Sequence, residues 1–169
     1  SRGVDVAQFS PALRSEALRR EWGVGPDDLV VLSVGRLAAE KNMELLMEAF
    51  TAIAAADARA RLVVVGDGPL RAALQRRCPA ALFVGQRGGA DLAAHYASAD
   101  LFLFPSLTET FGNVTPEAMA SGLALLAFDY AAAAQLIRSG ENGRLVPCGD
   151  SAAFVNAALA LAADAEGRR

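Results

Sequence analysis

Two cations lie just after the first apolar run of the chain. Arg36 and Lys41 stand five positions apart in the segment Gly35-Arg-Leu-Ala-Ala-Glu-Lys-Asn42, which follows the run 29–34. Cations in a strand-to-helix turn are suited to neutralising a diphosphate, and Gly35 permits the sharp bend that such a turn needs. Spacing alone also fits solvated loop charges, which are the common case for loop cations.

Two carboxylates flank a second loop, Glu109-Thr-Phe-Gly-Asn-Val-Thr-Pro-Glu117. Proline is favoured in the first turn of a helix, so Pro116 predicts a helix start with free backbone N–H groups from Gly112 onward. Such an end binds phosphate, and carboxylates accept hydrogen bonds from sugar or ribose hydroxyls. The alternative is that Glu117 only stabilises the helix start and Glu109 is solvated, because this loop can hold them up to roughly 26 Å apart.

Other polar features carry weaker signals. The Gly66-Asp-Gly-Pro69 segment predicts a turn with Pro69 at the first helical position, which turn chemistry explains without a ligand. His95, the one histidine, lies next to Tyr96 in a helical pattern and is assigned no role. No Asp-x-Asp pair follows a predicted strand, and Asp164-Ala-Glu166 falls in the expected C-terminal tail. We therefore expect no metal ion on a bound diphosphate.

The elements that position these residues follow from hydrophobic periodicity. Short apolar runs of the kind that parallel sheets bury on both faces predict strands at 29–34, 61–65, 81–84, 101–104, 123–128 and 144–146. Between them, helical patterns cover 42–56, 69–77, 91–98, 116–121, 131–139 and 150–163. This alternation predicts an α/β fold: a Rossmann-like, doubly wound, mainly parallel sheet of about six strands with helices on both faces. Ligands of such sheets bind at the carboxyl ends of the strands, so the loops after 34, 65, 84 and 104 are the expected site.

Composition limits the class of protein. The 169 residues suffice for one domain, and a net charge of −3 with scattered Lys and Arg gives no basic stripe for nucleic acid. The two cysteines, Cys78 and Cys148, have no metal-ligand spacing, and no apolar run approaches the roughly 18 residues of a membrane span. We expect a cytoplasmic domain, which in a longer protein can still lie at the inner face of a membrane.

Taken in order, these segments resemble the C-terminal domain of retaining glycosyltransferases of the GT-B fold that share a Glu-x7-Glu motif, the group 1 or family 4 type. The amino-acid sequences of segments 108–114 and 128–131 are most similar to those of bacterial mannosyltransferases. The matching motifs run nearly end to end: Gly3-Val-Asp5 with Phe9 and Pro11, Val34-Gly-Arg-Leu37, Glu40-Lys-Asn42, Val65-Gly-Asp-Gly-Pro69, Phe83-Val-Gly85, Ala99 to Ser106, Glu109 to Gly122, and Gly140-Glu-Asn-Gly143.

The resemblance implies a role for each matching residue. The catalytic set comprises the cations on the donor diphosphate and a carboxylate on the donor sugar: Arg36, Lys41 and Glu109. The donor-binding set comprises the ribose contact Glu117, the backbone that holds phosphate and sugar, and the backbone that borders the nucleobase: Phe111, Gly112, Asn113 and Val114, then Val84 and Gly85. The sequence departs from the family at Asp129-Tyr-Ala-Ala, where many relatives have two glycines and an acidic residue.

The implied function is that of an enzyme half. Residues 1–169 would be the sugar-nucleotide-binding C-terminal domain, with an N-terminal domain of similar size supplying the lipid or glycan acceptor. The donor would be GDP-mannose or, as the alternative, a UDP-sugar, with no metal or other cofactor. A two-domain nucleotide-sugar epimerase would need catalytic acids and histidines that this sequence lacks, whereas a nucleotide-binding module without activity remains an alternative.

Overall fold

The computed structural model describes residues 8–106, 114–129 and 143–167. Its strands match the predicted apolar runs to within one residue at each end. They are β1 (Val30–Val34), β2 (Arg61–Val65), β3 (Leu82–Gly85), β4 (Leu101–Phe104), β5 (Ala124–Phe128) and β6 (Gly143–Val146). They form one sheet in the order β3-β2-β1-β4-β5-β6, and every neighbouring pair is parallel. The predicted doubly wound α/β fold is confirmed.

The strand order reverses direction between β1 and β4. From β1 the chain adds β2 and β3 on one side, then returns to place β4 against the other side of β1, with Val31 beside Leu101. Loops that leave adjacent strands in opposite directions open a crevice between them. The carboxyl ends of β1 and β4 therefore mark the topological switch point of this sheet.

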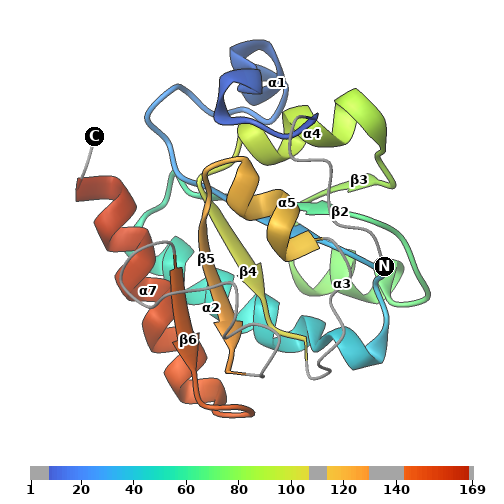
Figure 1. Cartoon of the computed structure of the whole chain (residues 1–169). Helices are drawn as coiled ribbons and strands as arrows, with labels where there is room; N and C mark the ends of the chain where they lie inside the picture. The colour runs from blue at the N-terminus through green and yellow to red at the C-terminus, as the bar shows by residue number, and fades with distance from the viewer. Residues whose placement is uncertain (1–7, 107–113, 130–142, 168–169) are drawn as a thin grey trace.

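Helices cover both faces of the sheet (Figure 1). One face packs against α2 (Met43–Ala56), α3 (Arg71–Arg77) and α7 (Ser151–Gly167), and the other against α1 (Glu16–Glu21), α4 (Gly89–Ala97) and α5 (Val114–Ala120). Two short 3-10 helices, η2 (Pro11–Leu13) and η3 (Ala39–Lys41), lie in the connections. The helix predicted at 131–139 lies outside the described residues. No helix among the described residues is long and apolar enough to cross a membrane.

Helix α2 shows how periodicity sets packing. The side chains predicted to share one face, at 43, 46, 47 and 50, are all buried. With helical spacing these positions form one stripe, which packs against the sheet and α7. The stripe anchors the start of α2, and this start follows directly on the loop that carries Lys41.

Several predicted helix boundaries were wrong, among them the start of α4, which is Gly89 and not Asp91. Helix α3 begins at Arg71, so Pro69 lies in the preceding turn, because the next amide, Leu70 N, is bonded 3.0 Å away to the carbonyl oxygen of Leu37. Helix α5 begins at Val114, which makes Pro116 its third residue. The segment 164–166, expected in the C-terminal tail, is helical because α7 continues packing against the core as far as Ala165.

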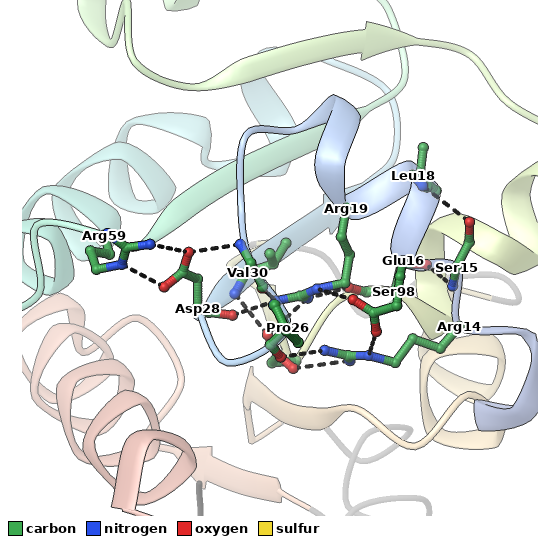
Figure 2. A network of polar contacts seen from close by, with 12 residues as sticks. Arg14, Ser15, Glu16, Leu18, Arg19, Pro26, Asp28, Val30, Arg59 and Ser98 are labelled. Atoms are coloured by element: carbon green, nitrogen blue, oxygen red, sulfur yellow. Dashed lines mark hydrogen bonds and ion pairs between the residues drawn. The ribbon is translucent and has the colours of Figure 1, made fainter.

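A fully buried arginine holds the amino edge of the sheet, and the sequence pattern predicted no element there. Arg19, on α1, donates through Nη1 to the carbonyl oxygen of Ser98 at 2.6 Å (Figure 2). Its Nη2 donates to the carbonyl oxygens of Gly25 and Asp28 at 2.7 and 2.6 Å. Asp100 Oδ2, just before β4, lies 3.5 Å from Nη1 and provides the opposite charge. These contacts fix the amino ends of β1 and β4, at the opposite edge of the sheet from the switch point.

Candidate functional site

A small hollow of about 20 Å³ lies at the switch point. Its walls come from the end of β1, the loop into α2, and the end of β4. The lining residues are Ser33, Val34, Gly35, Arg36, Lys41, Met43, Phe104, Pro105 and Ser106. The structure thus brings together the two cations that the sequence singled out, at the edge where ligands of doubly wound sheets bind.

A second hollow, of about 360 Å³, adjoins the first. Val34, Gly35 and Arg36 line both, so Arg36 stands where the two meet. The remaining walls come from the loops after β2 and β3: Val65, Gly66, Asp67, Gln86 and Arg87. The carboxyl edges of β1 to β4 therefore form one crevice, which we call the switch-point crevice.

The turn after β2 supports the loop that carries Arg36. Gly35 N donates to Val65 O and Leu37 N donates to Asp67 O, both at 3.0 Å. Gly66 has a φ of 134°, and a Cβ atom on it would lie 1.9 Å from the carbonyl oxygen of Gly35. Only glycine leaves room for this approach. The predicted turn role of the Gly66–Pro69 segment is confirmed, and the segment also borders the crevice.

Unpaired positive charge faces the crevice. Neither Arg36 nor Lys41 forms an ion pair with another residue that the structure describes. The nearby carboxylate of Asp67 is occupied: it accepts from Gly68 N and pairs with Arg71 at 2.9 Å, and these contacts lower its pKa. The crevice therefore presents two cations whose charge is not cancelled by the described residues, which suits an anionic ligand.

The end of β3 has its backbone already engaged. Gly85 O accepts from Gly66 N at 2.8 Å, and Val84 O accepts from Arg87 Nε at 3.0 Å. From this part of the chain, the second hollow is lined by the next two residues, Gln86 and Arg87, and not by Val84 or Gly85. Sequence reasoning missed these side chains, although they directly follow a predicted strand and that position could have identified them.

Glu117 lies in the middle of α5, where its carboxylate is partly buried. Its Oε1 accepts a hydrogen bond of 2.9 Å from the hydroxyl of Tyr96. Burial raises the pKa of Glu117, and the bond from Tyr96 partly opposes that rise. Glu117 is not among the described residues that line the two hollows. Sequence reasoning gave Tyr96 no role, since its contact with Glu117 joins two helices and leaves no local pattern.

The other predicted site residues lie beyond what the structure describes. Glu109, Phe111, Gly112 and Asn113 belong to 107–113, outside the described ranges, and Val114 is described only as the first residue of α5. Residues 130–142, which include the positions after Asp129 where the sequence departs from the family pattern, also lie outside the described ranges. Their predicted contacts with phosphate and sugar stay predictions.

His95, which the sequence analysis assigned no role, is a buried residue of the helix packing. Its side chain is buried, its Nδ1 lies 2.7 Å from the carbonyl oxygen of Asp91, and its ring lies 5.6 Å from that of Trp22. Across 8–106, 114–129 and 143–167, no group of three or more His, Cys, Asp or Glu side chains is gathered as metal ligands would be. The crevice chemistry that the described residues support is anion binding by cations.

Comparison with known proteins adds a family. The model of the family described as glycosyl transferases group 1 matches residues 28–164. A GDP-mannose-dependent alpha-mannosyltransferase of Mycobacterium tuberculosis is 46% identical over 151 residues, which cover 89% of this chain and 38% of that protein. The chain thus spans well under half the length of this curated relative.

Solved structures agree on the architecture. The Anabaena protein HepE, in complex with UDP and glucose, has a TM-score of 0.77 at 25% identity, covering 98% of this chain and 50% of that one. The C-terminal domain of LpcC, a glycosyl transferase group 1 family protein from Francisella tularensis, has a TM-score of 0.78 at 21% identity. The match covers 98% of this chain and 95% of the LpcC domain, which shows a shared fold over nearly all of both.

Proposed function

The chain belongs to the glycosyl transferases of group 1, and on that premise we propose that it binds the nucleotide-sugar donor of a retaining glycosyltransferase. The observation that carries the proposal is the pair of cations in the switch-point crevice, Arg36 and Lys41, without an ion-pair partner among the described residues. A diphosphate is the part of a nucleotide sugar that needs such charge. The crevice lies where doubly wound sheets bind nucleotides.

The proposal gives each predicted site residue a chemical task. Cleavage at the anomeric carbon develops negative charge on the leaving diphosphate, and Arg36 and Lys41 stabilise it where it grows. The start of α5 contributes backbone N–H groups and the helix dipole. Glu109 holds the donor sugar and Glu117 the ribose. Val84, Gly85 and the two residues that follow them border the nucleobase.

We propose mannose from GDP-mannose as the transferred hexosyl group. The support is the identity of 42–46% with three proteins described as GDP-mannose-dependent alpha-mannosyltransferases. A UDP-sugar is the second candidate, because HepE was solved with UDP and glucose and with UDP-glucose. The cation pair serves either donor, since the diphosphate is common to both.

The acceptor site and the metal requirement extend the proposal. Because the chain spans only 38% of its mannosyltransferase relative, a lipid or glycan acceptor would be held by a further, N-terminal domain. The isolated 169-residue chain would then bind nucleotide without transferring sugar, and turnover by the isolated chain would contradict this. The donor would bind without a metal ion, the two cations taking its place, and the enzyme would act in the cytoplasm or at the inner face of a membrane.

Calorimetric titration of the isolated chain with GDP, UDP and ADP in buffer with EDTA tests the proposal. We expect GDP to bind and Arg36→Ala/Lys41→Ala to lose that binding, because each charge-assisted contact is worth about 1.5–3 kcal/mol. An Arg20→Ala/Arg76→Ala variant makes the same charge change at exposed positions on α1 and α3 and should bind as the wild type does. Equal losses in both variants, or no binding of any nucleotide at millimolar concentration, would refute the donor site; preference for UDP would select the second donor.

A further inference from the structure

A side-chain hydrogen bond joins helices α4 and α5. The hydroxyl of Tyr96 donates to Oε1 of Glu117 at 2.9 Å. Tyr96 is the penultimate residue of α4, which follows β3, and Glu117 is on α5, which follows β4. The bond therefore links a side chain on the helix after β3 to a carboxylate on the helix after β4.

Packing against neighbouring aromatic rings restricts the Tyr96 side chain independently of its hydrogen bond to Glu117. It is fully buried, meets the Phe9 ring edge-on at 5.7 Å and 83°, and lies 6.0 Å from the Phe102 ring. Because packing already restricts the ring, the position of the hydroxyl is well defined.

The contact leaves the carboxylate able to bind a diol. Oε1 retains a second lone pair, and Oε2 has no hydrogen-bond partner among the described residues. Two vicinal hydroxyls can donate to such a carboxylate together, provided that it is ionised and correctly oriented. Burial raises the pKa of Glu117, and the Tyr96 hydroxyl favours the ionised form.

We propose that Tyr96 is a positioning residue, which orients the Glu117 carboxylate for the two ribose hydroxyls of the donor nucleotide. This inference rests on the proposed function, in which Glu117 contacts the ribose. It adds the residue that sets the orientation of that contact, from a helix outside the Glu-x7-Glu loop. Tyr96 itself does not touch the nucleotide.

The test compares GDP with 2′,3′-dideoxy-GDP, which lacks both ribose hydroxyls. Both are titrated into the wild-type chain, Tyr96→Phe, Glu117→Gln and Ser121→Ala. Tyr96→Phe keeps the packed ring and removes only the hydroxyl. Ser121→Ala is the matched control: its buried hydroxyl bonds the backbone carbonyl oxygen of Glu117 at 2.9 Å, so it reaches the same residue without reaching the carboxylate.

We expect Tyr96→Phe to weaken GDP binding roughly three- to tenfold and to leave dideoxy-GDP binding unchanged, so that the preference for GDP shrinks as it does in Glu117→Gln. Ser121→Ala should keep the wild-type preference. If Tyr96→Phe keeps the preference while Glu117→Gln loses it, or weakens both nucleotides equally, Tyr96 has a merely structural role and the inference is overturned. A wild-type chain that binds GDP without any preference removes the ribose contact and the inference with it. Failure of the wild-type chain to bind GDP at all overturns the proposed function instead.

Discussion

The side chain of Asn42 bridges the two loops of the switch point, its Nδ2 donating to the carbonyl oxygen of Pro105 at 3.1 Å. Asn42 also adopts the left-handed conformation, with φ 58° and ψ 48°, between η3 and α2. It is the only residue other than glycine with positive φ in the part of the chain that the structure describes. One residue therefore turns the chain after Lys41 and ties that turn to the loop after β4.

Substituting Asn42 separates these two tasks. Asn42→Gly keeps the left-handed turn and loses the hydrogen bond, so we expect GDP affinity to fall about two- to tenfold, the equivalent of one neutral hydrogen bond. Asn42→Ala loses the bond and adds a left-handed strain of about 1–2 kcal/mol, which urea unfolding should register as a further loss of stability. Unchanged GDP binding by Asn42→Gly would mean that the two loops keep their places independently.

Gly66→Ala should damage both the fold and the crevice. The new Cβ would lie 1.9 Å from Gly35 O, at a φ that disfavours any side chain, and we expect a loss of about 2–5 kcal/mol in the free energy of unfolding. Gly23→Ala is the control, because Gly23 has a φ of 79° and nothing within 4 Å of the added Cβ. It should lose only about 1–2 kcal/mol of stability, the cost of placing a side chain in the left-handed conformation. Equal losses in the two variants would contradict the close approach of the two turns.

Arg19→Met should destabilise the chain by about 3–5 kcal/mol in urea unfolding. The substitution leaves the carbonyl oxygens of Ser98, Gly25 and Asp28 without their charged donor in a buried site. Arg19→Lys should recover only part of the loss, because an ammonium group lacks the planar fork that reaches carbonyls on both sides. A loss below about 1 kcal/mol in Arg19→Met would show that these carbonyls find other partners.

The Asp28–Arg59 pair predicts a stability change in acid. Arg59 Nε lies 2.7 Å from Asp28 Oδ1, and this bond, with one from Gly25 N, lowers the pKa of Asp28 to about 2. An aspartate in the unfolded chain has a pKa of about 3.9. The stabilisation of the fold by ionised Asp28 is therefore complete above that pH and is lost as pH falls toward 2.

Urea unfolding at pH 7, 4, 3 and 2 measures this effect by comparison with Asp28→Asn, which cannot titrate there. The stability advantage of the wild type over Asp28→Asn should shrink from pH 4 to pH 2. Asp27→Asn makes the same charge change one residue away, outside the pair, and an identical pH dependence in that variant would assign the effect to net charge.

The sequence by itself determined the sheet and the cation pair. Apolar runs and the turn residues between them are local signals, so β1 to β6 appear in the structure to within one residue of prediction, and Arg36 and Lys41 line the expected crevice. Helix α1 escaped prediction because it is six residues long and is held by the buried contacts of Arg19 rather than by a periodic apolar face.

Only the tertiary structure decided how the crevice is held. Asn42 and Pro105 are 63 positions apart, Tyr96 and Glu117 are 21 apart, and Gly66 meets Gly35 through backbone atoms alone. None of these contacts leaves a periodic pattern, because each depends on which strands are neighbours and on the side chains that their packing directs together. Local periodicity can specify a strand or a helix, whereas the partner of a single polar group exists only once the whole sheet has been assembled.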